Sequence, residues 1–178
     1  MKKMSLTVII TSTMLLTNFN TLFSQDFEGY AAGLNISYPI AVGEILKDQE
    51  SPSVGIVVDT PHEFDLGSYA VGVGAGIELV NMGAEDENFS YTSFYLSLSS
   101  MVYETPAGPL SVYAGGGWFG SLGGTGAVML DYALPDQPIV IQPYFRGTFI
   151  TDSGVGGDNP TWILSIGAII NYDISTLF

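Results

Sequence analysis

The sequence contains no cysteine, one histidine and only four lysine or arginine residues in 178. Without cysteine the chain can form no disulfide framework, no thiolate metal site and no lipid-modified N-terminal cysteine. Charged residues make up 12% of the chain, which is half of the roughly 25% found in soluble globular proteins. Because 47% of the residues are hydrophobic, so few charges cannot cover the surface of an ordinary soluble domain.

A long hydrophobic run is also missing. Residues 4–16 (MSLTVIITSTMLL) follow Lys2 and Lys3, and this run is too short and too rich in threonine for a spanning helix. It is typical of a secretory signal, so we expect residues 1–24 to be removed and 25–178 to form one mature domain. After it, no apolar run approaches the roughly 20 residues of a spanning helix. An exported apolar chain of this kind indicates a closed β-barrel, which satisfies its own backbone hydrogen bonds in lipid.

Apolar side chains instead recur at every second position, as they do in a strand with lipid on one face and a lumen on the other. In residues 66–80 the odd positions are apolar from Tyr69 to Leu79, whereas the even positions carry Ser68, four small residues and Glu78. The segments 28–42 and 161–173 show the same alternation. Helical spacing explains none of these runs.

Turn signals divide the mature chain into eight candidate strands. They span 28–42, 52–60, 66–80, 89–103, 110–122, 124–134, 138–150 and 161–173. Short Pro-marked connections (TPHEFD, ETPAGP, PDQP) alternate with more acidic or Gly-rich ones (GEILKDQES, NMGAEDEN, GSLGGTG, TDSGVGGDNP). Bacterial barrels have short periplasmic turns and longer outer loops. The sequence therefore predicts an all-β, eight-stranded antiparallel up-and-down transmembrane barrel with both termini in the periplasm.

Outward-facing aromatic residues are expected to form two belts at the membrane interfaces. Those near the periplasmic ends of the candidate strands are Tyr30, Tyr69, Tyr132 and Tyr172. Those near the outer ends are Tyr38, Phe94, Trp118, Phe149 and Trp162.

The chain ends on an aromatic residue, Phe178, preceded on the same strand face by Ile174 and Tyr172. This ending resembles the C-terminal assembly signal of bacterial outer-membrane barrels, and the mature chain resembles the small eight-stranded, porin-like barrels of the OmpA and OmpX type. The resemblance implies a bacterial outer-membrane location and recognition by the barrel-assembly machinery. The chain differs from OmpA in one respect, since we expect it to have no periplasmic peptidoglycan-binding domain.

An eight-stranded barrel is just wide enough for side chains to fill it. Glycines and tyrosines share the inward positions, and the expected lumen rings are those of Tyr95, Tyr103, Tyr113 and Tyr144. Arg146 is the one cation in the predicted membrane region and needs a partner there. We expect that partner to be Glu78, across the barrel at similar depth, with Asp131 on the adjacent strand as the competitor. An ion pair that plugs the lumen is preferred over a transport role.

Removal of Lys2 and Lys3 leaves two cations against 18 carboxylates and changes the net charge from −14 to −16. Such a surface repels nucleic acid. Glu85, Asp86 and Glu87 are candidate ligands for a divalent cation in the second outer loop, but their spacing matches no known calcium loop. Solvation of the loop is the preferred interpretation, and no cofactor is expected.

Catalysis is disfavoured because the one histidine, His62, falls in a predicted periplasmic turn, on the membrane face opposite to lipid A. The preferred function is a non-enzymatic, monomeric barrel with a plugged polar lumen, whose outer loops serve surface structure, adhesion or contacts with lipids and lipopolysaccharide. The alternatives are a narrow channel or pocket for small solutes or hydrophobic molecules and, less favoured, a barrel that modifies lipid A. A soluble lipocalin-like barrel is disfavoured, since it would need a polar outer face.

Overall fold

The structure, a computed structural model, describes residues 28–42, 52–84, 87–152 and 160–177. Its strands are β1 (Ala31–Val42), β2 (Ser53–Leu66), β3 (Tyr69–Ala84), β4 (Glu87–Thr105), β5 (Gly108–Phe119), β6 (Leu122–Leu130), β7 (Tyr132–Ala133), β8 (Ile139–Ile150) and β9 (Thr161–Asp173). A short 3-10 helix, η1 (Ile174–Leu177), follows β9. Within the described ranges, no helix is long and apolar enough to cross a membrane.

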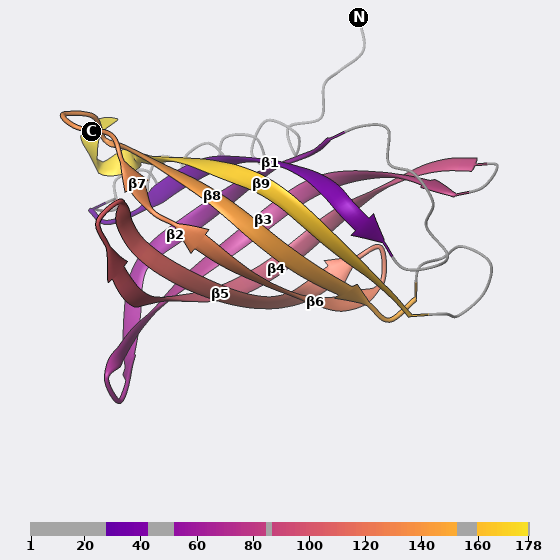
Figure 1. Cartoon of the computed structure of the whole chain (residues 1–178), viewed down its shortest axis with the longest axis horizontal. Helices are drawn as coiled ribbons and strands as arrows, with labels where there is room; N and C mark the ends of the chain where they lie inside the picture. Colours follow the sequence, from indigo (N-terminus) through magenta and orange to yellow (C-terminus); the bar gives the residue numbers. More distant parts are fainter. Residues whose placement is uncertain (1–27, 43–51, 85–86, 153–159, 178) are drawn as a thin grey trace, which may run out of the picture.

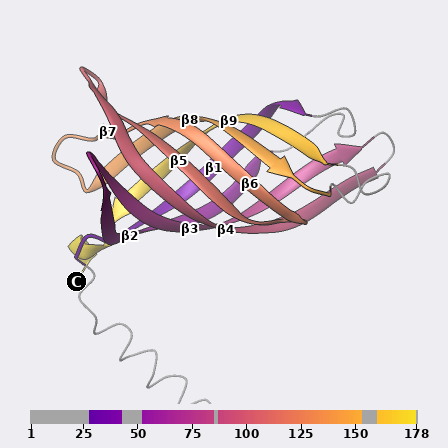
Figure 2. The same ribbon diagram turned by 90° about the horizontal axis from the view of Figure 1, so that it is seen from below.

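The strands form one closed antiparallel barrel (Figures 1 and 2). Neighbours along the chain pair from β1 to β6, β1 also pairs with β9, and β9 with β8. The pairing of β6 with β8 closes the ring. Because β6 and β7 are two pieces of one strand, both paired with β8 and separated only by Asp131, the barrel is eight-stranded. The predicted all-β, eight-stranded antiparallel barrel is confirmed, and the bounds of the last strand are those predicted, 161–173.

The connections follow an up-and-down path. Hairpins β2–β3, β4–β5 and β7–β8 lie at one end of the barrel with η1, whereas the β5–β6 turn lies at the other end (Figure 1). Each of these turns has a residue at positive φ: Gly67 (67°) in β2–β3, Gly108 (135°) in β4–β5, Gly120 (82°) in β5–β6 and Asp136 (60°) in β7–β8. Glycine and aspartate tolerate this left-handed backbone better than most residues. The expected Pro-marked turns at 104–109 and 135–138 are present.

Alternation along the strands places the buried polar groups inside the barrel, together with a buried apolar cluster, and large exposed apolar side chains outside. On β1, Asn35 and Ser37 are buried, whereas Leu34 and Ile36 are exposed. Serine, threonine, asparagine, one glutamate and one arginine make up the buried polar set. The exposed large hydrophobic side chains come from all eight strands of the barrel. This distribution is the reverse of that in a soluble domain.

The expected turn at residues 60–65 is wrong, because these residues belong to β2. The strand continues to Leu66 and turns at Gly67 and Ser68. Its register with β3 shifts between Asp59 and Glu63, which leaves Pro61 in the irregular segment. Proline has no N–H to donate to a strand ladder and is tolerated at a bulge. Thr60 Oγ1 stabilises the bulge by donating to the Val73 carbonyl at 2.9 Å.

The expected inward position of Tyr103 is also wrong. The register between β4 and β5 shifts between Met101 and Tyr103. An extra residue at a bulge reverses the alternation of all residues beyond it. Tyr103 is therefore 67% exposed on the outer face, near the end of the barrel that carries the β4–β5 hairpin.

Candidate functional site in the barrel interior

Arg146 and Glu78, from β8 and β3, form a bidentate ion pair inside the barrel. Arg146 Nη1 donates to Glu78 Oε2 and Nη2 to Oε1, both at 2.7 Å. Glu78 is 2% exposed and Arg146 6%. Paired N–H···O bonds between planar groups are the strongest protein ion pairs. The structure thus brings together the two residues that the sequence analysis paired.

Serines from β1 and β9 complete the hydrogen bonding of this pair. Ser37 Oγ donates to Glu78 Oε1 at 3.0 Å and accepts from Arg146 Nη2 at 3.1 Å. Ser165 Oγ accepts from Arg146 Nε at 3.4 Å. The guanidinium carbon also lies 5.4 Å from the centre of the Tyr144 ring, within range for a cation–π interaction. A buried charge needs such additional bonds, because water no longer solvates it.

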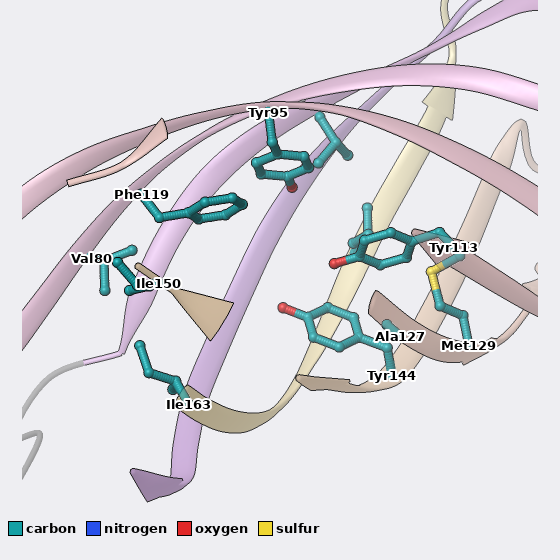
Figure 3. Packing of buried hydrophobic residues seen from close by; sticks show 11 residues of the cluster. Val80, Tyr95, Tyr113, Phe119, Ala127, Met129, Tyr144, Ile150 and Ile163 are labelled. Atoms are coloured by element: carbon teal, nitrogen blue, oxygen red, sulfur yellow. The ribbon is translucent and has the colours of Figure 1, made fainter. Parts of the chain in front are cut away.

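Tyr144 lies beside the ion pair, and its ring is buried inside the barrel together with those of Tyr95 and Tyr113 (Figure 3). Tyr144 donates its hydroxyl to Asn35 Oδ1 at 2.8 Å. Tyr95 stacks on Phe119, with ring centres 5.8 Å apart and planes at 10°. Figure 3 shows Phe119 close to Val80, Ile150 and Ile163, which form an apolar group on one side of the tyrosines.

Two inward glycines make room for the tyrosine rings. A Cβ atom at Gly76 would collide with the ring of Tyr95, and one at Gly167 would lie 2.6 Å from the ring of Tyr144. Real Cβ atoms do not approach other atoms this closely. The small inward residues and the large rings are therefore complementary parts of one packed interior.

Asp131 does not contact Arg146 but belongs to a second polar network nearer the hairpin end. It accepts from Ser111 Oγ at 2.6 Å and from Gln142 Nε2 at 2.7 Å. Asn171 Nδ2 donates to Gln142 Oε1 at 2.7 Å and to Asp59 Oδ2 at 3.1 Å. Apart from Asp131, the sequence analysis missed this network. Its members sit at polar inward positions of their strands, but only the barrel register shows that they touch.

Two small cavities lie beside these networks. One, of about 20 Å³, is lined by the ion pair together with Ser37, Tyr91, Phe119 and other residues. The other, of about 50 Å³, is lined by Asp59, Tyr95, Tyr113, Gln142 and neighbours. A single water needs roughly 10–15 Å³ on this scale. Each cavity therefore holds a few waters at most, whereas small-molecule pockets measure roughly 300–1,000 Å³.

The aromatic residues expected at the two interfaces face outward. Phe94 lies opposite Trp118 on β4 and β5, and Phe149 opposite Trp162 on β8 and β9. All four are exposed, as are Tyr38, Tyr69 and Tyr132. Tyr30 and Tyr172 are half-buried, and Tyr172 OH accepts from Thr176 Oγ1 at 3.1 Å. Tyr103, which was expected in the lumen, is a further outward aromatic residue at the hairpin end.

The remaining candidate positions carry no assembled site in the described part of the chain. His62 is exposed in the β2 bulge. No group of three or more His, Cys, Asp or Glu side chains suited to a metal ion occurs among the described residues. Glu85, Asp86 and Phe178 lie outside the described residues, and Glu87 opens β4. The expected continuation of the strand face from Tyr172 to Ile174 is wrong, because β9 ends at Asp173 and Ile174 opens η1. The Ile174 N–H donates to the Tyr30 carbonyl at 3.0 Å, which ties the end of β9 to the start of β1.

Comparison with models of known protein families finds no match, and comparison with curated protein sequences finds none either.

Proposed function

We propose that this protein is a non-enzymatic integral β-barrel of a bacterial outer membrane, with a plugged polar lumen and a role in surface structure, adhesion or envelope integrity. The observation that carries the proposal is the reversed distribution of side chains. Apolar residues such as Leu34, Ile56 and Leu96 cover the outside, while the ion pair and the buried serines and threonines lie inside. An apolar surface of this extent is unstable in water and stable in lipid.

The same observation argues against a lipocalin-like carrier. A soluble barrel needs a polar outside and, to hold a hydrophobic ligand, an apolar hollow inside. Here the interior contains Ser37, Glu78 and Arg146 in hydrogen-bonded contact and Asn35 bonded to Tyr144. The two cavities described above, among the described residues, measure about 20 and 50 Å³. The aromatic residues at the two ends of the outer face support a membrane span between them.

The packed interior favours a structural barrel over a channel. The Arg146–Glu78 pair and the tyrosines Tyr95, Tyr113 and Tyr144 occupy the cross-section of the lumen. A narrow channel or pocket remains the alternative and requires these side chains to move. Modification of lipid A is less favoured, since His62 is exposed in a bulge and meets no serine or carboxylate partner in the described hydrogen bonds.

In this proposal the termini are periplasmic, because the short hairpins and η1 share one end of the barrel (Figure 1). The partners are outer-membrane lipids and lipopolysaccharide, and the barrel-assembly machinery during insertion. The acidic composition disfavours nucleic acid. A closed barrel has no free strand edge to pair with another copy, which is in keeping with a monomer.

Expression of the full chain in a bacterium with an outer membrane tests the proposal. We expect the mature protein in the outer-membrane fraction, and we expect it to migrate differently on a gel before and after boiling, since closed barrels resist unfolding in cold detergent. Recovery as a soluble periplasmic monomer with no such shift would overturn the proposal.

A further inference from the structure

The larger of the two lumen cavities, of about 50 Å³, lies between the tyrosine rings and the second polar network. Carboxylate and hydroxyl groups in its lining come from Asp59, Tyr95, Ser97, Ser99 and Tyr113. Asp59, Ser97 and Ser99 are only half-buried, and the polar network that contains Asp59 lies nearer the hairpin end. Water and small ions can therefore reach the cavity from that end of the barrel.

Two of the lining side chains are buried and have no hydrogen-bond partner among the described residues. Tyr95 is 6% exposed and Tyr113 8%, and neither hydroxyl makes a hydrogen bond there, whereas the neighbouring Tyr144 donates to Asn35. Figure 3 shows the Tyr95 and Tyr113 hydroxyls directed into the space among the three rings. Because a buried polar group without a partner is costly, these hydroxyls indicate an occupant that they can contact.

Asp59 turns one carboxylate oxygen toward the same cavity. Its Oδ2 accepts from Asn171 Nδ2 at 3.1 Å, whereas its Oδ1 accepts from none of the described residues. A Cβ atom at Gly74 would lie 2.8 Å from Asp59 Oδ1 and 3.0 Å from Ser97 Oγ, so these two oxygens face the same point of the lumen. A carboxylate oxygen grouped with hydroxyl oxygens suits a hard cation, which prefers oxygen ligands.

The charge of the second polar network also favours a cation. Hydrogen bonds through Asn171 and Gln142 connect Asp59 to a second carboxylate, that of Asp131. The side chains that donate to the two carboxylates are Asn171, Gln142 and Ser111, and all three are uncharged. Carboxylates removed from bulk water need a positive partner. A cation in the cavity would supply this partner beside Asp59.

We propose that the cavity binds one monovalent inorganic cation, sodium or potassium, through Asp59 Oδ1 and the hydroxyl oxygens of Tyr95, Ser97 and Tyr113. Such an ion is similar in size to a water molecule, and the cavity has room for a few waters. Calcium fits less well, because it takes roughly 6–8 oxygen ligands that commonly include several carboxylates. Of the described carboxylates, that of Asp59 alone lines the cavity. The inference does not depend on the proposed membrane location.

Thermal unfolding of the purified protein in a nonionic detergent tests the site. Tryptophan fluorescence gives the unfolding midpoint in sodium, potassium or choline chloride at equal ionic strength. A ligand that binds only the folded state raises this midpoint as its concentration increases. Choline is too large for the cavity and controls for ionic strength. We expect sodium or potassium to raise the midpoint in a saturable manner and choline to leave it unchanged.

Two variants and a matched control locate the effect. Asp59→Asn keeps an oxygen for the Asn171 hydrogen bond but removes the charge, so the dependence on sodium or potassium should disappear. Asp65→Asn makes the same change at an exposed position of the same strand and should behave as the wild type. Tyr113→Phe removes one hydroxyl ligand without changing the ring and should weaken binding about tenfold. This second variant tests the site even where Asp59→Asn does not fold.

Equal midpoints of the wild-type protein in sodium, potassium and choline chloride would overturn the inference, because the cavity would then hold water alone. So would a sodium or potassium effect that persists in folded Asp59→Asn or in Tyr113→Phe at full strength. A stabilisation seen only with calcium or magnesium, or one lost equally in Asp65→Asn, would also contradict a monovalent site at Asp59.

Discussion

Arg146 on β8 and Glu78 on β3 meet inside the barrel through two hydrogen bonds of 2.7 Å, although 68 residues separate them in the chain. Both are buried, and Ser37 bonds to both. This contact joins two strands that are not neighbours in the barrel. It therefore spans the lumen between β3 and β8 and fills part of its cross-section.

Neutralising either member of the pair should destabilise the barrel more than neutralising both. Glu78→Gln or Arg146→Met leaves one buried charge without its partner, at a cost of about 3–5 kcal/mol. The double variant should recover much of this loss, because no unpaired charge remains. Urea unfolding of the refolded protein in detergent micelles measures the free energies. Asp131→Asn is the control, since Asp131 does not contact Arg146; losses that simply add in the double variant would contradict the coupling.

The intact pair should keep the barrel closed to ions. In planar lipid bilayers we expect almost no conductance from the wild-type protein, because the ion pair and the tyrosine rings fill the lumen. The Glu78→Gln, Arg146→Met double variant should give small, frequent openings as water enters. A steady and reproducible wild-type conductance would instead support the channel alternative.

Gly76 should not tolerate alanine, whereas Gly126 should. A Cβ at Gly76 collides with the ring of Tyr95 inside the lumen, and overpacking of this kind costs about 1–3 kcal/mol. A Cβ at Gly126 points outward and meets nothing closer than 3.5 Å. Thermal unfolding followed by gel migration compares Gly76→Ala with Gly126→Ala. Tyr95→Leu should restore part of the loss in Gly76→Ala, and equal stability of the two alanine variants would contradict the packing.

Deletion of Phe178 should impair insertion in cells but leave refolding in detergent unchanged. The reason is that the insertion machinery recognises the proposed assembly signal, whereas the strand pairing that closes the barrel ends at Asp173. The measurement is the heat-modifiable fraction in outer membranes, set beside the refolding yield of the purified chain. Phe178→Tyr keeps the aromatic ring and should insert normally; normal insertion of the deletion variant would show that the terminal ring is incidental.

Alternation in the sequence was sufficient to predict the barrel and most of its inward and outward faces. Side-chain direction in a strand depends on position alone, with a period of two, so Leu34 outside and Asn35 inside follow from the local pattern. The turn residues then gave the strand number, and the bounds of β9 are those expected. Arg146 had two expected partners, because only Glu78 and Asp131 were placed inward at a suitable depth, and the position of Glu78 across the barrel favoured it.

The tertiary structure alone decided the bulges and the contacts between distant strands. The bulge between Met101 and Tyr103 moves Tyr103 from the lumen to the outer face, and the one between Asp59 and Glu63 carries β2 past Pro61. Neither can be read from period-two alternation, because a bulge is defined by the register of the partner strand. The two partners of Asp131, which are Ser111 and Gln142, depend in the same way on strand tilt and stagger. These geometric quantities exist only once the sheet has closed into a barrel.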